Sequence, residues 1–276
     1  MQVIWISRIF YRGMKEMRKN KTKIYLAGDS TVSTYQIMEA PQAGWGQMLY
    51  KQFLYADKCI CYHPKWSQYS QVTCYELPEI EIINCAMAGR SSRSFREEGR
   101  LQEIDQRIQE GDYLFVQFAH NDANKEKKER YVPIDAYAES LNQYRNVCRK
   151  HGAILVLVTA IAMRDDDNYN AGEKHRFSIS FPAYRAEMIR YAADKKLILL
   201  DLGEATTRYL NTLTIEETKS IYLWAEENRY QGKYQMGVAD NAHLSEYGSN
   251  KYASILAELI KNHKSPLLDS VRRNLL

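Results

Sequence analysis

The stretch KIYLAGDST, residues 23–31, joins a short apolar run to a glycine and three polar residues. Four later runs have a similar content of aliphatic, β-branched and aromatic residues without strict polar alternation. Such runs are typical of strands that are covered on both faces of a sheet. The five predicted strands are Lys23–Ala27, Ile80–Asn84, Tyr113–Ala119, Ala153–Ala160 and Leu197–Leu202.

Helical patterns separate these strands. An alternation of strands and helices indicates right-handed βαβ units and a mostly parallel sheet, so we predict an α/β fold. The predicted helices are Gly44–Tyr55, Phe95–Glu110, Ile134–His151, Pro182–Lys195, Glu204–Tyr209, Thr214–Glu226 and Ser245–Lys261.

The length of 276 residues suits one α/β domain, which we place at residues 23–276 after an N-terminal extension of residues 1–22. The composition, 45% hydrophobic and 26% charged, argues against disorder. The net charge of +4 is too small to indicate a nucleic-acid partner. We interpret the charged run Lys125–Arg130 as solvated surface. No apolar run approaches the roughly 20 residues of a membrane span.

Five cysteines in no repeating framework indicate reduced thiols, and we therefore expect a cytoplasmic protein. The N-terminal residues lack the positive region and cleavage site of a signal peptide. The spacing of Cys59 and Cys61 is not that of a zinc site, so we expect no metal and no cofactor. The acidic triplet Asp165–Asp167 lacks the glycine and distal glutamate of a calcium loop and is interpreted as a solvated turn.

Parallel sheets place their functional sites at the carboxyl ends of the strands. After the first predicted strand, Ser30 would present its hydroxyl at the start of a helix, where outward-pointing N–H groups favour an oxyanion. This position suits a nucleophile. The alternative is that Asp29 or Ser30 only caps the helix.

Two further strand ends carry hydrogen-bond donors. Gly89 follows the second strand and, without a Cβ, could bring its N–H close to a ligand. Asn121 follows the third strand, where its amide could donate to an oxyanion while Asp122 braces the loop. Taken alone, each segment is also compatible with an ordinary turn.

Asp240 and His243 lie just before the last predicted helix. A carboxylate three residues before an imidazole can accept from its Nδ1–H, which fixes the tautomer and stabilises the imidazolium. The alternative is a surface histidine beside a helix-capping group. Together the strand ends and the entry to the last helix supply a nucleophile, a base, an acid and three oxyanion donors, which are the Ser30 N–H, the Gly89 N–H and the Asn121 amide.

These blocks resemble the SGNH (GDSL-like) hydrolases and, more narrowly, their rhamnogalacturonan acetylesterase branch. The resemblance runs from about Lys23 to Lys261. It implies a three-layer α/β/α sandwich with five parallel strands, similar to flavodoxin, and the catalytic and oxyanion roles given above. The matching segments are GDSTV (28–32), GWGQML (44–49), NCAMAGRSSRSF (84–95), VQFAHND (116–122), FPAYRAEM (181–188) and DNAHLSEYGSNKYA (240–253).

Two departures from the family pattern stand out. Ala119 occupies a position that is usually glycine in the third block, and we expect a slight shift of that loop. The segment Phe53–Glu79 is longer than the family norm and is expected to reach the rim of the site.

The predicted reaction is ester hydrolysis through an acyl-Ser30 intermediate. The resemblance implies an O-acetyl group on a plant cell-wall oligosaccharide, either pectic or xylan-derived. Trp45 and Trp66 are candidates for stacking on the sugar at the rim of the site. Arg90 and Arg93 are candidates for attracting a uronic-acid carboxylate.

Two other functions stay open at this stage. A lipase or thioesterase of the same fold would need an apolar acyl channel. A carbohydrate-binding relative that lost catalysis would bind sugar without turnover. The sequence does not indicate the oligomeric state.

Overall fold

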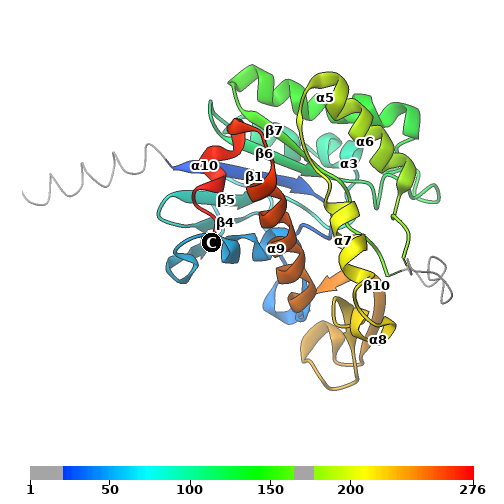
Figure 1. Ribbon diagram of the computed structural model, residues 1–276. Helices are drawn as coiled ribbons and strands as arrows, with labels where there is room; N and C mark the ends of the chain where they lie inside the picture. The colour runs from blue at the N-terminus through cyan, green and yellow to red at the C-terminus, as the bar shows by residue number, and fades with distance from the viewer. Residues whose placement is uncertain (1–20, 165–176) are drawn as a thin grey trace, which may run out of the picture.

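A seven-stranded sheet lies between two layers of helices in the computed structural model, which describes residues 21–164 and 177–276 (Figure 1). The strand order is β3-β4-β5-β1-β6-β7-β8, and the last five strands in that order run parallel. The predicted α/β sandwich is therefore confirmed. The strands are β1 (Thr22–Gly28), β3 (Ile60–Tyr62), β4 (Thr73–Glu76), β5 (Ile80–Asn84), β6 (Tyr113–Gln117), β7 (Ile154–Val158) and β8 (Ile198–Leu200). Most of the predicted N-terminal extension and the triplet Asp165–Asp167 lie outside the described residues.

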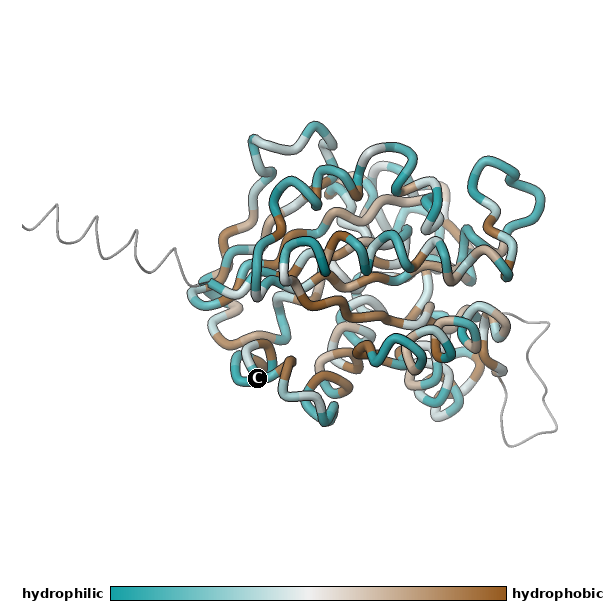
Figure 2. Tube along the Cα trace, turned by 90° about the horizontal axis from the view of Figure 1, so that it is seen from above, coloured by the Kyte–Doolittle hydropathy of each residue, from teal (hydrophilic) through white to brown (hydrophobic). Residues whose placement is uncertain are grey.

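Each central strand sends alternate side chains into two separate cores. In β1, Ile24 and Leu26 enter one apolar cluster, whereas Tyr25 and Ala27 enter the other. The hydrophobic segments consequently run through the middle of the molecule and hydrophilic ones lie at its outline (Figure 2). One face is covered by α3 (Ser92–Glu97), α4 (Arg100–Asp105), α5 (Ile134–His151) and α6 (Pro182–Lys195). The other face is covered by α2 (Trp45–Met48), α7 (Leu202–Leu210), α9 (Glu246–Asn262) and α10 (Asp269–Arg272).

Local signals set the ends of several helices. Pro182 begins α6 in its first turn, and Gly152 ends α5 with φ of 69°. Both helices have the predicted bounds. The predicted helix Phe95–Glu110 is instead broken between α3 and α4, because Gly99 adopts φ of 83°. The predicted helix Gly44–Tyr55 is also shorter, since α2 passes into the 3₁₀ helix η2 (Leu49–Gln52).

A second, three-stranded sheet has the order β2-β10-β9 and was not predicted. Its strands are β2 (Gln42–Ala43), β9 (Tyr222–Ala225) and β10 (Val238–Ser245). The predicted helix Thr214–Glu226 is wrong in its second half, where α8 (Ile215–Thr218) gives way to β9. Tyr222 and Leu223 are buried and pair with β10, so long-range pairing overrides the helical pattern.

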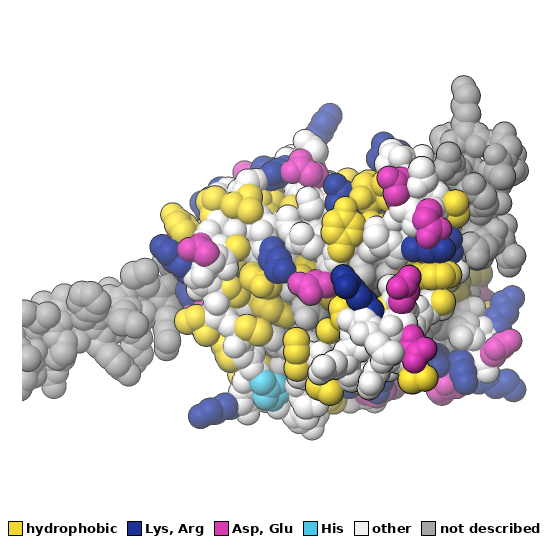
Figure 3. Space-filling view, turned by 90° about the horizontal axis from the view of Figure 1, so that it is seen from below, with side chains coloured by type: hydrophobic (Ala, Val, Ile, Leu, Met, Phe, Trp, Pro, Cys, Tyr) yellow, Lys and Arg dark blue, Asp and Glu magenta, His cyan; other side chains and the backbone are white. Residues whose placement is uncertain are grey.

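The long segment Phe53–Glu79 extends the main sheet with the antiparallel strands β4 and β3. Part of it lines a hollow of about 550 Å³, together with the 3₁₀ helix η1 (Ile37–Glu39) and Tyr35. Positive and negative side chains are interspersed with hydrophobic ones on the face shown in Figure 3. Within the described part of the chain, no helix has the length and apolar character needed to cross a membrane.

The first turn of α9 packs through Gly248 against the backbone of Ile221, in the connection between α8 and β9. A Cβ at this position would lie 1.9 Å from the carbonyl oxygen of Ile221. We predict that Gly248→Ala lowers the free energy of unfolding by about 1–3 kcal/mol, as overpacking does. The higher helix propensity of alanine alone would instead raise the free energy of unfolding by about 1 kcal/mol. Urea unfolding measures the difference, with Glu258→Ala, on an exposed position of the same helix, as control. A Gly248→Ala protein as stable as wild type would contradict this packing.

Candidate active site

Ser30 lies in a tight turn directly after β1. The N–H groups of Val32 and Ser33 both donate to the carbonyl oxygen of Asp29 at 3.2 Å. The predicted start of a helix is therefore wrong, because this single turn does not continue as a helix. Ser30 is 8% exposed, and its carbonyl oxygen accepts from the Tyr35 hydroxyl at 2.9 Å.

The buried carboxylate of Asp29 holds this turn in place. Its Oδ1 accepts from the N–H and hydroxyl of Thr31 at 2.9 and 2.7 Å, and its Oδ2 accepts from Nδ1 of His120 at 3.1 Å. Burial opposes ionisation, but the charge and hydrogen bond of His120 and the bonds from Thr31 bring the pKa of Asp29 below its usual range. The carboxylate thus joins the turn after β1 to the loop after β6.

His243 stands in a bulge of β10. Asp240 pairs with Leu223 of β9 and Leu244 pairs with the adjacent Tyr222, so residues 241–243 have no partner in this ladder. Nδ1 of His243 donates to Oδ2 of Asp240 at 2.7 Å. The predicted pair is therefore held within one bulged strand.

Asp240 is fixed as an ionised acceptor. Its Oδ1 accepts from the N–H groups of Ala242 and His243 at 2.8 and 2.9 Å. Burial raises the pKa of Asp240, but the hydrogen bonds from the His243 ring and the two N–H groups outweigh it and lower the pKa to about 2. An acceptor of this kind keeps the imidazole proton on Nδ1, so Nε2 remains the basic nitrogen.

A pocket of about 320 Å³ brings Ser30, His243 and Asn121 together. Ser30 follows β1, His243 belongs to β10 and Asn121 follows β6. Three segments that are distant in sequence therefore line one pocket. The rings of Phe181 and His120 pack in a T-shaped arrangement, with their centroids 4.8 Å apart. His120, Met163 and Phe181 were not predicted as site residues, although Phe181 begins a segment that carries the family resemblance. The other lining residues are Thr31, His120, Ala123, Asn124, Met163, Phe181 and Ala242.

Gly89 is joined to this pocket through Asn121. Gly89 adopts φ of 80°, which favours glycine, and is not among the lining residues. Nδ2 of Asn121 donates to the carbonyl oxygen of Arg90, next to Gly89, at 3.0 Å. The loops after β5 and β6 therefore meet at the edge of the pocket.

The buried side chain of Asp122 stabilises the loop after β6 by bonding it to α3, as predicted. Its Oδ1 accepts from the N–H and hydroxyl of Ser92 at 3.0 and 2.5 Å, at the start of α3. Burial raises the pKa of Asp122 to about 7 despite these bonds. The preceding Ala119 has φ of 157°, a positive value of the kind glycine adopts readily, so the backbone keeps a glycine-like conformation.

The predicted position of Trp45 at the rim is wrong. Trp45 is 1% exposed, and its Nε1 donates to Oε1 of Gln117 at 2.8 Å in the core. Nε2 of Gln117 in turn donates to the Thr31 hydroxyl at 2.6 Å, so Trp45 supports the Ser30 turn from beneath. The guanidinium carbon of Arg107 lies 4.5 Å from the centroid of the Trp66 ring. Trp66 does not line the pocket that contains Ser30.

The two predicted binding arginines have partners within the protein. Nε of Arg90 donates to both carboxylate oxygens of Glu98 at 2.9 Å. Nη2 of Arg93 donates to the carbonyl oxygen of Lys128 at 2.6 Å. Both side chains remain partly exposed, and neither lines the pocket that contains Ser30.

The GDSL-like lipase/acylhydrolase family model matches residues 24–256, from β1 into α9. The chain belongs to this family. The resemblance predicted from the blocks around Ser30, Gly89, Asn121 and His243 is thereby confirmed. Acylhydrolases of the GDSL-like family cleave carboxylic esters, so the chain is a carboxylic ester hydrolase.

Known relatives in the GDSL-like family match most of the chain. The probable rhamnogalacturonan acetylesterase YesY of Bacillus subtilis (strain 168) is 36% identical over 250 residues, covering 90% of this chain and 96% of YesY. Rhamnogalacturonan acetylesterase RhgT of the same strain is 32% identical over 253 residues, covering 92% of this chain and 95% of RhgT. The crystal structure of B. subtilis YxiM has a TM-score of 0.68 and 25% identity, covering 87% of this chain and 56% of that chain.

The raised pKa of Asp122 predicts a pH-dependent stability. The folded protein holds this proton up to about pH 7, whereas the unfolded chain loses it near pH 3.8. Between these values the folded state binds more protons, so stability falls as the pH rises. Each pKa unit corresponds to about 1.4 kcal/mol. We predict that Asp122→Asn removes this dependence on pH. The free energy of unfolding of the variant, relative to that of wild type, should therefore rise by a few kcal/mol between pH 4 and pH 8.

Urea unfolding at several pH values measures this difference. Asp57→Asn, at an exposed carboxylate, is the control and should follow wild type. A constant difference between Asp122→Asn and wild type across this range would contradict the prediction.

Proposed function

We propose that the protein is a serine esterase that removes O-acetyl groups from plant cell-wall-derived oligosaccharides, pectic rhamnogalacturonan or xylan, through an acyl-Ser30 intermediate. The observation that carries this proposal is one pocket lined by Ser30, by Asn121 and by a His243 whose Nδ1 is bonded to Asp240.

The acylation step follows from this arrangement. His243 Nε2 takes the Ser30 proton as Oγ forms a bond to the acetyl carbon. The ionised Asp240 stabilises the imidazolium. Collapse of the tetrahedral intermediate breaks the ester bond, and His243 gives the proton to the leaving sugar oxygen, which departs as a hydroxyl group.

Deacylation repeats these steps with water. His243 takes a proton from the water as it attacks the acetyl carbon, and acetate leaves as Ser30 regains its proton. The Ser30 N–H, the Gly89 N–H and the Asn121 amide stabilise the oxyanion in both tetrahedral intermediates.

Two observations support a short acyl group on a sugar. The pocket is small, about 320 Å³, and Ala123, Met163 and Phe181 supply apolar walls. YesY and RhgT are described as acetylesterases of rhamnogalacturonan. The alternatives are an SGNH hydrolase of longer acyl esters and an inactive carbohydrate-binding relative. Contact of Arg90 and Arg93 with a uronic acid stays a prediction.

We also propose a cytoplasmic location, supported by five free thiols, because reducing compartments keep thiols unpaired. Imported oligosaccharides would then be the substrates. Recovery of the protein outside the cytoplasm in cell fractionation would overturn the location alone.

Substitutions in the pocket test the mechanism. We predict that Ser30→Ala and His243→Ala abolish turnover of 4-nitrophenyl acetate, since they remove the nucleophile and the base. Asn121→Ala should lower kcat by about 10²–10³, the usual loss for one oxyanion donor. Ser178→Ala, at an exposed serine, is the control. Near-wild-type turnover by a folded Ser30→Ala protein would refute the acyl-Ser30 mechanism.

The acyl preference separates the candidate functions. On 4-nitrophenyl esters from acetate to octanoate, we expect kcat/KM to be highest for acetate and to fall with chain length, because the apolar walls limit the pocket. Acetate release from acetylated rhamnogalacturonan and xylan oligosaccharides then identifies the sugar. A preference for octanoate would favour the longer-chain hydrolase, and sugar binding without any turnover would favour the inactive relative.

A further inference from the structure

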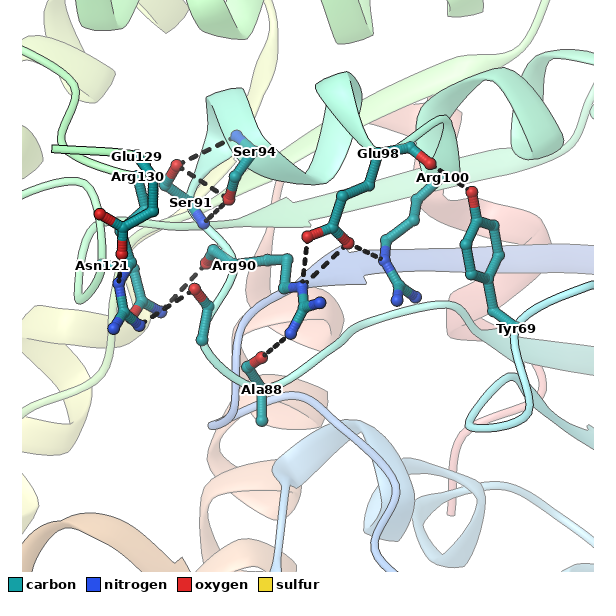
Figure 4. A network of polar contacts seen from close by, with 11 residues as sticks. Tyr69, Ala88, Arg90, Ser91, Ser94, Glu98, Arg100, Asn121, Glu129 and Arg130 are labelled. Atoms are coloured by element: carbon teal, nitrogen blue, oxygen red, sulfur yellow. Dashed lines mark hydrogen bonds and ion pairs between the residues drawn. The ribbon is translucent and has the colours of Figure 1, made fainter. Parts of the chain in front are cut away.

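Three consecutive carbonyl groups in the loop after β5 accept hydrogen bonds from side chains (Figure 4). The oxygen of Ala88 accepts from Nη1 of Arg90 at 2.8 Å. The oxygen of Gly89 accepts from Nη1 of Arg130 at 3.2 Å, and that of Arg90 accepts from Nδ2 of Asn121 at 3.0 Å. A side chain therefore fixes the direction of each peptide group in this short segment, and two of the three side chains come from the loop after β6.

The contact on Ala88 determines where the Gly89 N–H points. The carbonyl of Ala88 and the N–H of Gly89 belong to the same peptide plane, and in a trans peptide they point in opposite directions. By holding the carbonyl, the Arg90 guanidinium holds the N–H that the proposed mechanism uses.

The orientation of the Asn121 amide is also determined by its partners. Nη1 of Arg130 donates to Oδ1 of Asn121 at 2.9 Å, while Nδ2 donates to the Arg90 carbonyl. A guanidinium can only donate and a carbonyl can only accept. Reversal of the amide would place donor against donor and acceptor against acceptor. The NH₂ group therefore stays on the side of the Gly89 segment.

The Arg90 side chain is itself held in place. Glu98 binds Nε of Arg90 and also accepts from Nε of Arg100 at 2.8 Å. The Arg100 guanidinium stacks on Tyr69, 4.1 Å from the ring centroid, and the Tyr69 hydroxyl donates to the Glu98 carbonyl at 2.5 Å. Figure 4 shows this row of side chains to the right of Arg90.

Arg130 approaches the loop closely. A Cβ at Gly89 would lie 3.2 Å from its Nη1, and the Arg130 side chain is 24% exposed. The interpretation of the run Lys125–Arg130 as solvated surface is therefore wrong for its last residue.

We propose that Arg90 and Arg130 are positioning residues for the oxyanion-binding groups. Arg90 aims the Gly89 N–H through the Ala88 carbonyl, and Arg130 aims the Asn121 amide through Oδ1 and steadies the Gly89 carbonyl. This proposal rests on the proposed esterase function. Donors that are already aimed need no reorganisation when the oxyanion forms, so their effect falls on the chemical step.

The test compares Arg130→Met with Arg130→Lys on 4-nitrophenyl acetate. Because both bonds come from one nitrogen, an ammonium at that place could make both. We expect Arg130→Met to lower kcat by about 10- to 100-fold with KM within about twofold, somewhat less than loss of a donor itself. Arg130→Lys should recover most of kcat. If Arg130→Met does not fold, Arg130→Gln replaces it as the variant that removes the guanidinium.

A double-mutant cycle tests the route of the effect. If Arg130 acts through Asn121, then Arg130→Met should cost much less in an Asn121→Ala background than in wild type. Equal losses in both backgrounds, wild-type kcat in Arg130→Met, or no recovery in Arg130→Lys would each overturn the role of Arg130.

Arg90→Met should likewise lower kcat with little change in KM. A raised KM for uronic-acid-containing oligosaccharides with unchanged kcat would instead make Arg90 a substrate-binding residue and overturn its positioning role. Arg96→Met, on the exposed side of α3, is the matched control. Turnover by Ser30→Ala would refute the esterase mechanism, whereas an inactive Ser30→Ala beside a fully active Arg130→Met would refute only the positioning role.

Discussion

The parallel pairing of β1 with β5 on one side and β6 on the other is the constraint on which the site depends. Leu26 pairs with Asn84 and Gly28 with Gln117, so three strands end at the same edge of the sheet. The loops that follow them carry Ser30, Gly89 and Asn121. Each loop needs only a short local turn to bring its polar groups together, because the sheet has already brought the strand ends side by side.

Two buried carboxylates near this edge have pKa values that are shifted in opposite directions. Asp29 has His120 and Thr31 as partners, and its pKa is lowered. Burial, together with the nearby negative charge of Asp29, raises the pKa of Asp122 to about 7, although the hydrogen bonds from Ser92 act in the opposite direction. One carboxylate thus remains charged and orders the turn that contains Ser30, while the other joins the β6 loop to α3 as a largely neutral group below pH 7.

Much of the fold could be predicted because its signals are local. Apolar runs located the five parallel strands, and Pro182 and Gly152 marked the ends of α6 and α5. The missed elements depend on partner strands: β9 pairs with β10, β4 pairs with the edge of β5, and β3 pairs with β4.

The same distinction applies to the site. Ser30, Asn121 and His243 could be placed together from strand ends and the family resemblance. The burial of Trp45 and the contacts of Arg130 could not, since they arise from packing between segments far apart in sequence. A charged run on a loop gives no local sign that its last arginine turns inward.

The bulge in β10 separates two structural requirements that one strand would otherwise have to meet together. The pairs on either side of residues 241–243 set the register of the small sheet, and the bulged residues set the position of the imidazole. Ala242 has no partner in this ladder, so a substitution there could move the His243 imidazole without unpairing β9. The geometry of the histidine can thus be adjusted, in evolution or by engineering, while the sheet that supports it keeps its hydrogen bonds.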